Sequence, residues 1–112
     1  MAHYHVALTT GAVGDLDGIC SHIDRQRGPD AVDEWLEKFD QAIGSLETFP
    51  DRGSVPPELA AIGIKDFRQK QFKPYRIIYR VIERSVFILV VAHGSRDFQS
   101  LLQDRLLRGS AD

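Results

Sequence analysis

Hydrophobic and polar residues alternate along residues 75–81, and an apolar run follows at residues 86–92. Alternation is typical of a strand with one buried face, whereas a continuous apolar run is typical of a strand buried on both faces. About three residues, 83–85, separate the two runs, which fits a tight hairpin. The pattern therefore predicts two adjacent antiparallel strands, the second of them at the centre of a sheet.

Apolar residues recur at helical spacing in two segments of the first half of the chain. The first stripe contains Ala12, Leu16, Ile19, Cys20 and Ile23, and the second contains Val32, Trp35, Leu36, Phe39, Ile43 and Leu46. Gly28 and Pro29 lie between them, and a glycine is suited to end one helix and a proline to begin the next. So short a link predicts an antiparallel helical hairpin, whose apolar surface needs a sheet to cover it.

Weaker patterns predict three further elements. Residues 4–9 alternate weakly as an opening strand, and residues 66–72 are another strand candidate. Residues 98–106 carry a short terminal helical stripe, with Ser95 or Asp97 as its N-cap. The predicted order is a strand, a helical hairpin, a three-stranded antiparallel meander and a short C-terminal helix, which is an α+β fold.

The stretch 49–63 contains three prolines and two glycines, so we expect a surface loop with at most one helical turn near residues 58–61. At 112 residues the chain has the length of one domain with a real core. We assign residues 1–108 to this single domain and expect residues 109–112 to be a C-terminal tail.

Composition narrows the class of protein. The chain is 43% hydrophobic and 27% charged, which is typical of a soluble globular domain. Its lone cysteine, Cys20, excludes an internal disulfide framework and lies on an apolar helical face, where we expect a core thiol. We expect no metal and no cofactor. Since no segment resembles a signal peptide or a membrane span, the expectation is a cytoplasmic protein without a membrane partner.

The net charge of −2 hides an asymmetry along the chain. Residues 15–58 contain eleven acids and four bases, whereas residues 65–84 contain seven bases and two acids. The pattern predicts an acidic helical part and a basic sheet, which can present a basic patch to an acidic partner. The chain lacks the overall positive charge typical of proteins that bind nucleic acid mainly through its phosphates.

Basic residues on two of the predicted strands are candidates for anion recognition. Arg76 and Arg80 share parity, so we expect them to project from one face of the sheet, and Arg68 and Lys70 share a face of the preceding strand. Fixed guanidiniums suit phosphate or carboxylate. The alternative is that Arg76 and Arg80 only solvate the open face of a small sheet.

The order of elements, together with the segments ELAAIGIKDFRQ, PYRIIYRV and VAHGSRD, resembles the RelE/ParE superfamily of bacterial toxin–antitoxin toxins. The resemblance covers nearly the whole chain, and the His-Gly-x-Arg-Asp sequence at residues 93–97 looks more like the ParE branch. It implies a toxin of a type II toxin–antitoxin module, of the kind linked to plasmid stabilisation and growth arrest. The implied partner is a cognate antitoxin, a small DNA-binding protein with a disordered C-terminal segment that wraps the toxin.

The two branches imply different targets. ParE-type toxins are understood to act by binding, trapping DNA gyrase on cut DNA and blocking replication. RelE-type toxins cut messenger RNA on the ribosome, which requires a base, an acid and a stabiliser of phosphorane charge. On the RelE-type alternative the catalytic candidates are Arg76, Arg80 and Arg96 for charge and His93 for proton transfer. We expect the ParE-type function, since no tyrosine follows Tyr79 and the RelE set is therefore incomplete.

The residues expected to contact the target or the antitoxin follow from the same resemblance. They are Arg68, Lys70, Arg76, Arg80, Arg96, Trp35 and Phe39. The basic strands are expected to receive acidic antitoxin side chains, while exposed parts of Leu16, Ile19, Trp35 or Phe39 accept apolar ones. The alternatives are that Trp35 and Phe39 belong to the core and that His93 only hydrogen-bonds at a strand end. A third class is an inactive relative that binds its antitoxin and has no toxic target.

Overall fold

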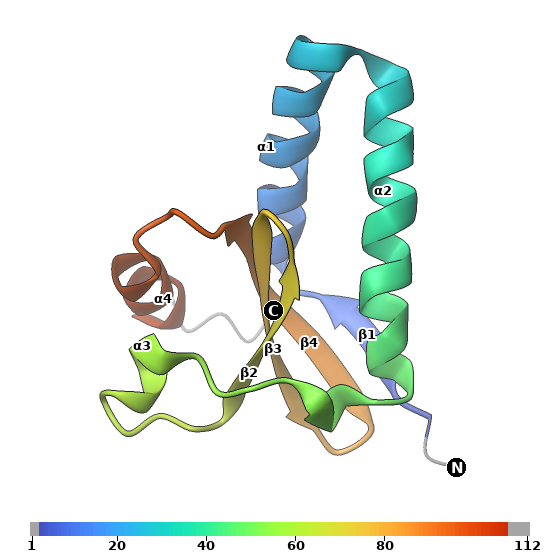
Figure 1. Cartoon of the computed structure of the whole chain (residues 1–112). Coiled ribbons are helices and arrows are strands. Elements are labelled where there is room, and N and C mark those ends of the chain that lie inside the picture. Colours follow the sequence, from blue (N-terminus) through green and yellow to red (C-terminus); the bar gives the residue numbers. More distant parts are fainter. Residues whose placement is uncertain (1–2, 108–112) are drawn as a thin grey trace.

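The chain folds around a four-stranded sheet, with a long helical hairpin on one side and a short helix on the other (Figure 1). The computed structural model describes residues 3–107, so the tail expected at residues 109–112 lies outside the described part. The elements are β1 (His5–Leu8), α1 (Thr10–Arg27), α2 (Pro29–Gly44), α3 (Pro57–Ala60), β2 (Phe67–Phe72), β3 (Tyr75–Ile82), β4 (Ser85–His93) and α4 (Phe98–Leu107), with 3-10 turns at Ser45–Glu47 and Pro50–Arg52. The predicted α+β fold is confirmed.

The strands lie in the order β1-β4-β3-β2. Strands β2, β3 and β4 form the predicted antiparallel meander. The opening strand β1 pairs in parallel with β4, from His5 opposite Ser85 to Leu8 opposite Ile88. This pairing places β4 between two neighbours, which explains why its sequence is apolar throughout.

Local chemistry fixes where the helices begin and end. The Thr9 hydroxyl accepts the Ala12 N–H at 3.2 Å and donates to the Ile88 carbonyl at 3.0 Å, which caps α1 and ties it to β4. Gly28, with φ of 88°, separates α1 from α2 as the sequence predicts. The Asp97 carboxylate caps α4 by accepting the Ser100 N–H at 3.2 Å. Bonds from Ser100 also hold the pKa of Asp97 below its usual value.

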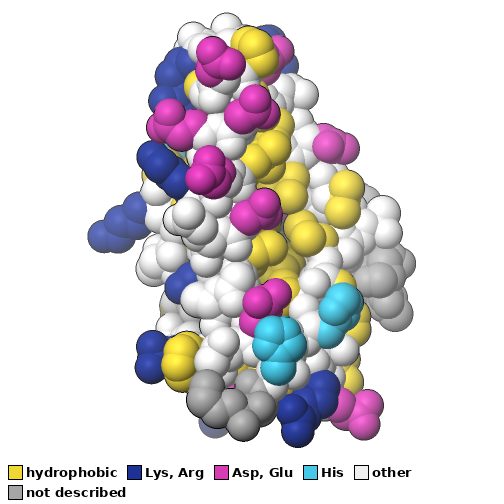
Figure 2. Space-filling model, turned by 90° about the vertical axis from the view of Figure 1, so that its right-hand side faces the viewer, with side chains coloured by type: hydrophobic (Ala, Val, Ile, Leu, Met, Phe, Trp, Pro, Cys, Tyr) yellow, Lys and Arg dark blue, Asp and Glu magenta, His cyan; other side chains and the backbone are white. Residues whose placement is uncertain are grey.

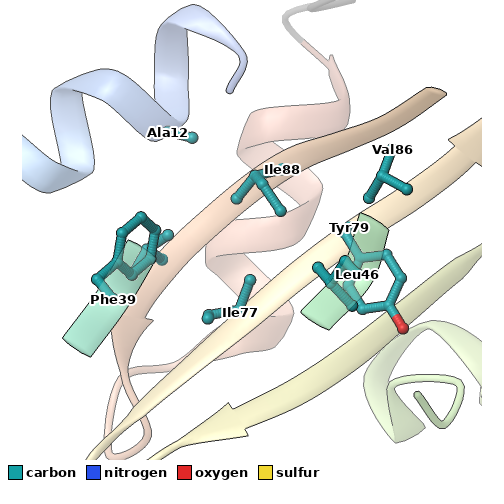
Figure 3. Packing of buried hydrophobic residues seen from close by; sticks show 8 residues of the cluster. Ala12, Phe39, Leu46, Ile77, Tyr79, Val86 and Ile88 are labelled. Atoms are coloured by element: carbon teal, nitrogen blue, oxygen red, sulfur yellow. The ribbon is translucent and has the colours of Figure 1, made fainter. Parts of the chain in front are cut away.

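Two apolar cores lie on opposite faces of the sheet. On the face covered by the hairpin, here called the hairpin face, the buried residues are Ala12, Phe39, Leu46, Ile77, Tyr79, Val86, Ile88 and Val91 (Figure 3). On the other, the α4 face, they are Leu59, Phe67, Ile78, Leu89, Val90, Ala92, Phe98 and Leu102. Because β3 and β4 lie between these two cores, both strands carry apolar side chains on both faces.

A β-bulge in β4 lets one strand serve both cores. Ile78 pairs with Val90 and Tyr79 pairs with Ile88, so Leu89 is an extra residue without a partner in β3. Because one residue is inserted, the alternation of faces reverses beyond it. Ile88 therefore lies in the hairpin-face core and Val90, two residues later, lies in the α4-face core.

Candidate functional site

The sheet divides the basic residues of the strands between its two faces. Arg68 and Lys70 pair across the strands with residues of the hairpin-face core, so they lie on the hairpin face. Arg76 and Arg80 lie on the α4 face, where their guanidiniums stack over aromatic rings of α4 and β2. The predicted shared parity of Arg76 and Arg80 is correct. The basic strands nevertheless do not form one continuous patch.

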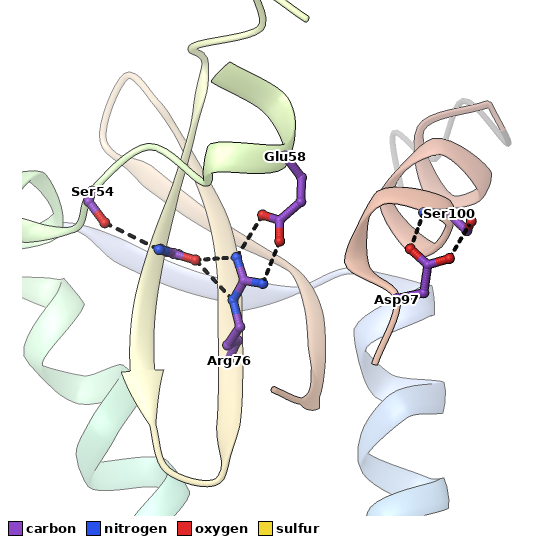
Figure 4. Close-up of polar contacts among 6 residues, drawn as sticks. Ser54, Glu58, Arg76, Asp97 and Ser100 are labelled. Carbon is purple, nitrogen blue, oxygen red and sulfur yellow. Dashed lines mark hydrogen bonds and ion pairs between the residues drawn. The ribbon is translucent and has the colours of Figure 1, made fainter. Parts of the chain in front are cut away.

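Arg76 is engaged within the molecule (Figure 4). Its guanidinium makes two hydrogen bonds of 2.9 Å to the Glu58 carboxylate, and further bonds join it to the Gln69 side chain. It also lies 4.0 Å from the centre of the Phe98 ring. Bonds from Arg76 hold the pKa of the Glu58 carboxyl below its usual value. The Arg76 charge is therefore neutralised by an internal anion, and its recognition of an external one stays a prediction.

The other strand cations differ in their availability. Arg80 is exposed, with its guanidinium 5.5 Å from the centre of the Phe67 ring. Arg68 donates to the carbonyls of Asp51 at 3.2 Å and Gly53 at 2.8 Å, so it anchors the loop before β2. Lys70 lines a hollow of about 320 Å³ between this loop and the hairpin face. Of these three, Arg80 offers the most accessible charge.

His93 and Arg96 converge at the end of β4. The His93 Nδ1 accepts the Ser95 backbone N–H at 3.1 Å, and its ring lies edge-on to Tyr75 with 5.9 Å between ring centres. Arg96 follows in the loop before α4. Both residues line an open depression of about 450 Å³ together with His22 from α1. His22 was not predicted, since no sequence pattern shows which face of α1 packs beside the end of β4.

The four catalytic candidates of the RelE-type alternative do not come together. His93 pairs with Tyr75 at one end of the β3–β4 ladder, and Arg80 pairs with Phe87, six residues back along β4. This is a separation of about 20 Å along the strand. Arg76 pairs with Ala92, between the positions of His93 and Arg80 on the ladder, but its side chain lies on the opposite face of the sheet from Tyr75. The structure thus unites only His93 and Arg96.

A half-buried ion pair beside the depression completes the edge of β4. Asp15 and Arg105 are joined by hydrogen bonds of 2.9 and 3.1 Å. The Asp15 carboxylate also accepts the Val91 N–H at 2.9 Å, and Arg105 donates to the Leu89 carbonyl at 2.6 Å. Since β1 ends opposite Ile88, these side chains bond to the backbone groups of β4 that β1 does not reach. The sequence contains no sign of this pair, whose members are 90 positions apart.

The aromatic contact candidates lie in or against the core. Phe39 is 1% exposed, so the expectation that it offers a contact surface is wrong. Trp35 is half-buried and stacks on Phe39 with 5.4 Å between ring centres. Leu16 and Ile19 are also half-buried. On the face of the molecule drawn in Figure 2, acidic side chains lie beside a band of hydrophobic ones.

Three further features concern metal binding, the cysteine thiol and membrane-spanning helices. Within residues 3–107, no three histidine, cysteine, aspartate or glutamate side chains gather as they do around a metal ion. Cys20 is half-buried and therefore not the core thiol expected; burial, and secondarily the nearby Asp17, raise the pKa of its thiol. Over the same residues, no helix has the length and apolar character that crossing a membrane requires.

Comparisons with known proteins agree with this architecture. Residues 6–98 match the family described as the ParE toxin of the type II toxin–antitoxin system parDE. No curated protein matches the chain. A structure of the chromosomal ParDE system from P. aeruginosa is 19% identical and covers 81% of this chain and 96% of its own, with a TM-score of 0.67. The toxin–antitoxin complex RelBE2 from Mycobacterium tuberculosis is 25% identical and covers 82% of this chain and 99% of its own, with a TM-score of 0.53. The family match spans most of the chain, which therefore belongs to the ParE toxins of type II toxin–antitoxin systems.

Proposed function

We propose that this toxin inhibits DNA gyrase and so blocks replication, and that a cognate antitoxin neutralises it. The observation that carries the proposal is the separation of the residues that RNA cleavage needs. Membership of the ParE family supports the same target.

Phosphodiester cleavage needs an acid, a base and a charge-stabilising group within hydrogen-bonding reach of one phosphate. Here Arg76 is bound to Glu58, and Arg80 is about 20 Å along the ladder from His93. The pair formed by His93 and Arg96 supplies at most two of the three roles. A protein that acts by binding has no such requirement, and its exposed charges can lie on separate surfaces.

Arg80 is the strand cation that we assign to target recognition. It is exposed on the α4 face, and the Phe67 ring beneath its guanidinium restrains the side chain. Arg68, Lys70 and Arg96 remain further candidates. Arg76 acts by holding α3, β2 and α4 together rather than by touching the target.

The antitoxin is proposed to cover the hairpin. The solved relatives bear the names of toxin–antitoxin complexes, which supports a partner of this kind. Half-buried Leu16, Ile19 and Trp35 supply apolar contacts on the hairpin. A partner that covers the hairpin also meets the exposed acidic side chains of α2, which favours basic residues in that part of the antitoxin. These acids are Asp30, Asp33, Glu34, Glu37 and Asp40.

A supercoiling reaction tests the gyrase proposal. We expect the purified toxin to inhibit supercoiling in a dose-dependent manner and to leave cleaved DNA, and we expect the cognate antitoxin to reverse both effects. Arg80→Glu should weaken inhibition about tenfold or more, because a contact to a charged group is worth this much. Arg25→Glu, a charge reversal at another exposed position, on α1, is the matched control and should leave inhibition unchanged.

Two results oppose the proposal. Folded toxin without effect on gyrase, combined with cleavage of messenger RNA on ribosomes, would establish the RelE-type alternative. Folded toxin that affects neither reaction, and that arrests no growth when its antitoxin is absent, would place the chain among inactive antitoxin-binding relatives. Equal losses for Arg80→Glu and Arg25→Glu would instead remove Arg80 from the target surface.

A further inference from the structure

The depression between α1 and the end of β4 gathers cationic and polar side chains from three parts of the chain. His22 comes from α1, Tyr75 and His93 come from the paired ends of β3 and β4, and Arg96 comes from the loop before α4. Its volume of about 450 Å³ lies within the range of small-molecule sites. The inference drawn from it is independent of the gyrase proposal.

The charge in the depression favours an anion. Asp15 is the only acid among the lining residues, and its carboxylate is already bound by Arg105 and by the Val91 N–H. Its negative charge is therefore compensated. His22, His93 and Arg96 remain as donors around the opening. Within residues 3–107, none of the ion pairs joins one of these three side chains to a carboxylate.

A hydrogen bond sets the orientation of one of these donors. Because the Ser95 backbone N–H donates to Nδ1 of His93, that nitrogen carries the lone pair. We therefore assign the proton of the neutral ring to Nε2, on the far side of the ring from Ser95. His93 thus presents an N–H donor in its neutral form as well as in its charged form.

Two glycines of α1 supply an independent argument. Gly14 and Gly18 are one helical turn apart and both line the depression. A glycine inside a helix lowers its stability relative to alanine. A Cβ at either position would meet no heavy atom within 4 Å, so packing within the chain does not require glycine there. Because glycine has no side chain, these two positions leave open space beside His22.

We propose that this depression binds the phosphate group of a nucleotide unit, with His22, His93 and Arg96 as its donors. Three donors from separate elements suit a tetrahedral oxyanion, whose oxygens point in different directions. The remaining volume along Gly14 and Gly18 accommodates the nucleoside. Free nucleotides and nucleic-acid backbones share this chemistry.

The four histidines of the chain give a direct test with built-in controls. The full chain is titrated with inorganic phosphate, then with a deoxymononucleotide, then with a short single-stranded DNA, while the imidazole NMR signals are followed. We expect the signals of His22 and His93 to shift with saturation. His5 lies at the opposite end of the sheet, about 26 Å along β4 from His93, and its signals should not move. Saturation by the mononucleotide would identify a free nucleotide as a sufficient ligand, whereas saturation by the DNA alone would identify the polymer backbone.

Substitutions separate binding from folding. His93→Gln and Arg96→Gln should each weaken nucleotide binding about tenfold, since each removes a charge-assisted hydrogen bond. Gly18→Gln should also weaken binding because its side chain occupies the space beside His22, yet it should raise the melting temperature because glutamine favours the helix. Ser21→Gln places the same side chain on an exposed position of α1 outside the depression and should not change binding.

Three results would overturn the proposal. One is the absence of saturable shifts for all three probes. Another is an equal response of all four histidines, which would indicate general charge screening. The third is a Gly18→Gln protein that is stabilised but binds as the parent does.

Discussion

Tyr79 shows how one polar atom is accommodated in the core. Its ring is fully buried on the hairpin face, and its hydroxyl donates to the Pro50 carbonyl at 2.6 Å. Gly53 lies so close to this hydroxyl that a side chain there would collide with it. The alternating pattern of β3 predicts a buried position at residue 79, but it does not predict that the loop of residues 50–53 supplies the acceptor.

Tyr79→Phe should destabilise the protein by about 1–2 kcal/mol, because the Pro50 carbonyl loses its buried partner. Burial raises the pKa of the Tyr79 phenol. A group whose pKa is higher in the folded state contributes its full stabilisation to the fold below its unfolded pKa, which is about 10 for tyrosine. That contribution is lost as pH rises through the folded-state pKa. Urea unfolding should therefore show the difference between parent and variant shrinking in alkali. A difference independent of pH would contradict this account.

Glu58 is the second residue whose environment determines its charge. Glu58→Gln leaves the Arg76 guanidinium, whose side chain is 13% exposed, without its carboxylate. We expect a loss of about 2 kcal/mol, a value reduced because Glu58 itself is 25% exposed. Since the pKa of Glu58 is lowered in the folded state, its contribution is present above the unfolded value of about 4.3 and disappears as pH falls through the folded value.

Chemical denaturation of Glu58→Gln between neutral pH and about pH 3 checks this prediction, since the variant and the parent should converge in acid. Glu34→Gln is the control. Glu34 pairs with Lys38 at 3.3 Å, but both side chains are mostly exposed, so its removal should change stability little. Equal effects of the two substitutions would mean that the Arg76 network contributes nothing beyond a surface ion pair.

At the scale of the elements, the pair formed by Asp15 and Arg105 joins α1, β4 and α4. Asp15→Ala leaves the Val91 N–H without its acceptor and Arg105 without its carboxylate. We expect a loss of about 2–4 kcal/mol and faster hydrogen exchange at the Val91 amide. Asp15→Asn keeps an acceptor for that amide and should restore part of the exchange protection but not the ion pair.

Asp17→Ala is the matched control, since Asp17 is an exposed acid two positions further along α1. It should leave both stability and exchange unchanged. If Asp15→Ala behaves as Asp17→Ala does, the edge of β4 is completed in some other way. A strand edge whose backbone groups are released is also prone to pair with other chains, so Asp15→Ala should aggregate more readily than its control.

An element was predictable where the sequence pattern that specifies it lies within a few neighbouring residues. Strands β3 and β4 and the hairpin of α1 and α2 were predictable, because periodicity, Gly28 and Pro29 act within a few positions. The partner of β1 was not, because four weakly patterned residues do not specify which strand they join. The bulge at Leu89 was hidden for another reason: where every residue is apolar, a reversal of faces leaves no trace in the pattern.

At the scale of the whole molecule, the type of a functional residue is visible in the sequence, whereas its position relative to other residues is not. The sequence correctly drew attention to His93, Arg96, Arg76 and Arg80 as chemically capable side chains. It did not show that Arg80 lies about 20 Å along the ladder from His93. Nor did it show that Glu58 of α3, 18 positions from Arg76, neutralises that arginine. Such pairings depend on tertiary contacts between segments that carry no common period.

The placement of β1 and Asp15 also has a consequence for how the toxin appears during its synthesis. Strand β1 has no partner until Ser85–Ile88 of β4 have been synthesised, and Asp15 has no ion-pair partner until Arg105 has been synthesised. A nascent chain that ends before β4 has an exposed hairpin without the complete sheet that covers it. The sheet is therefore expected to be completed only after β4 has been synthesised, and this delay leaves a period in which a partner already present meets the chain before it is fully folded.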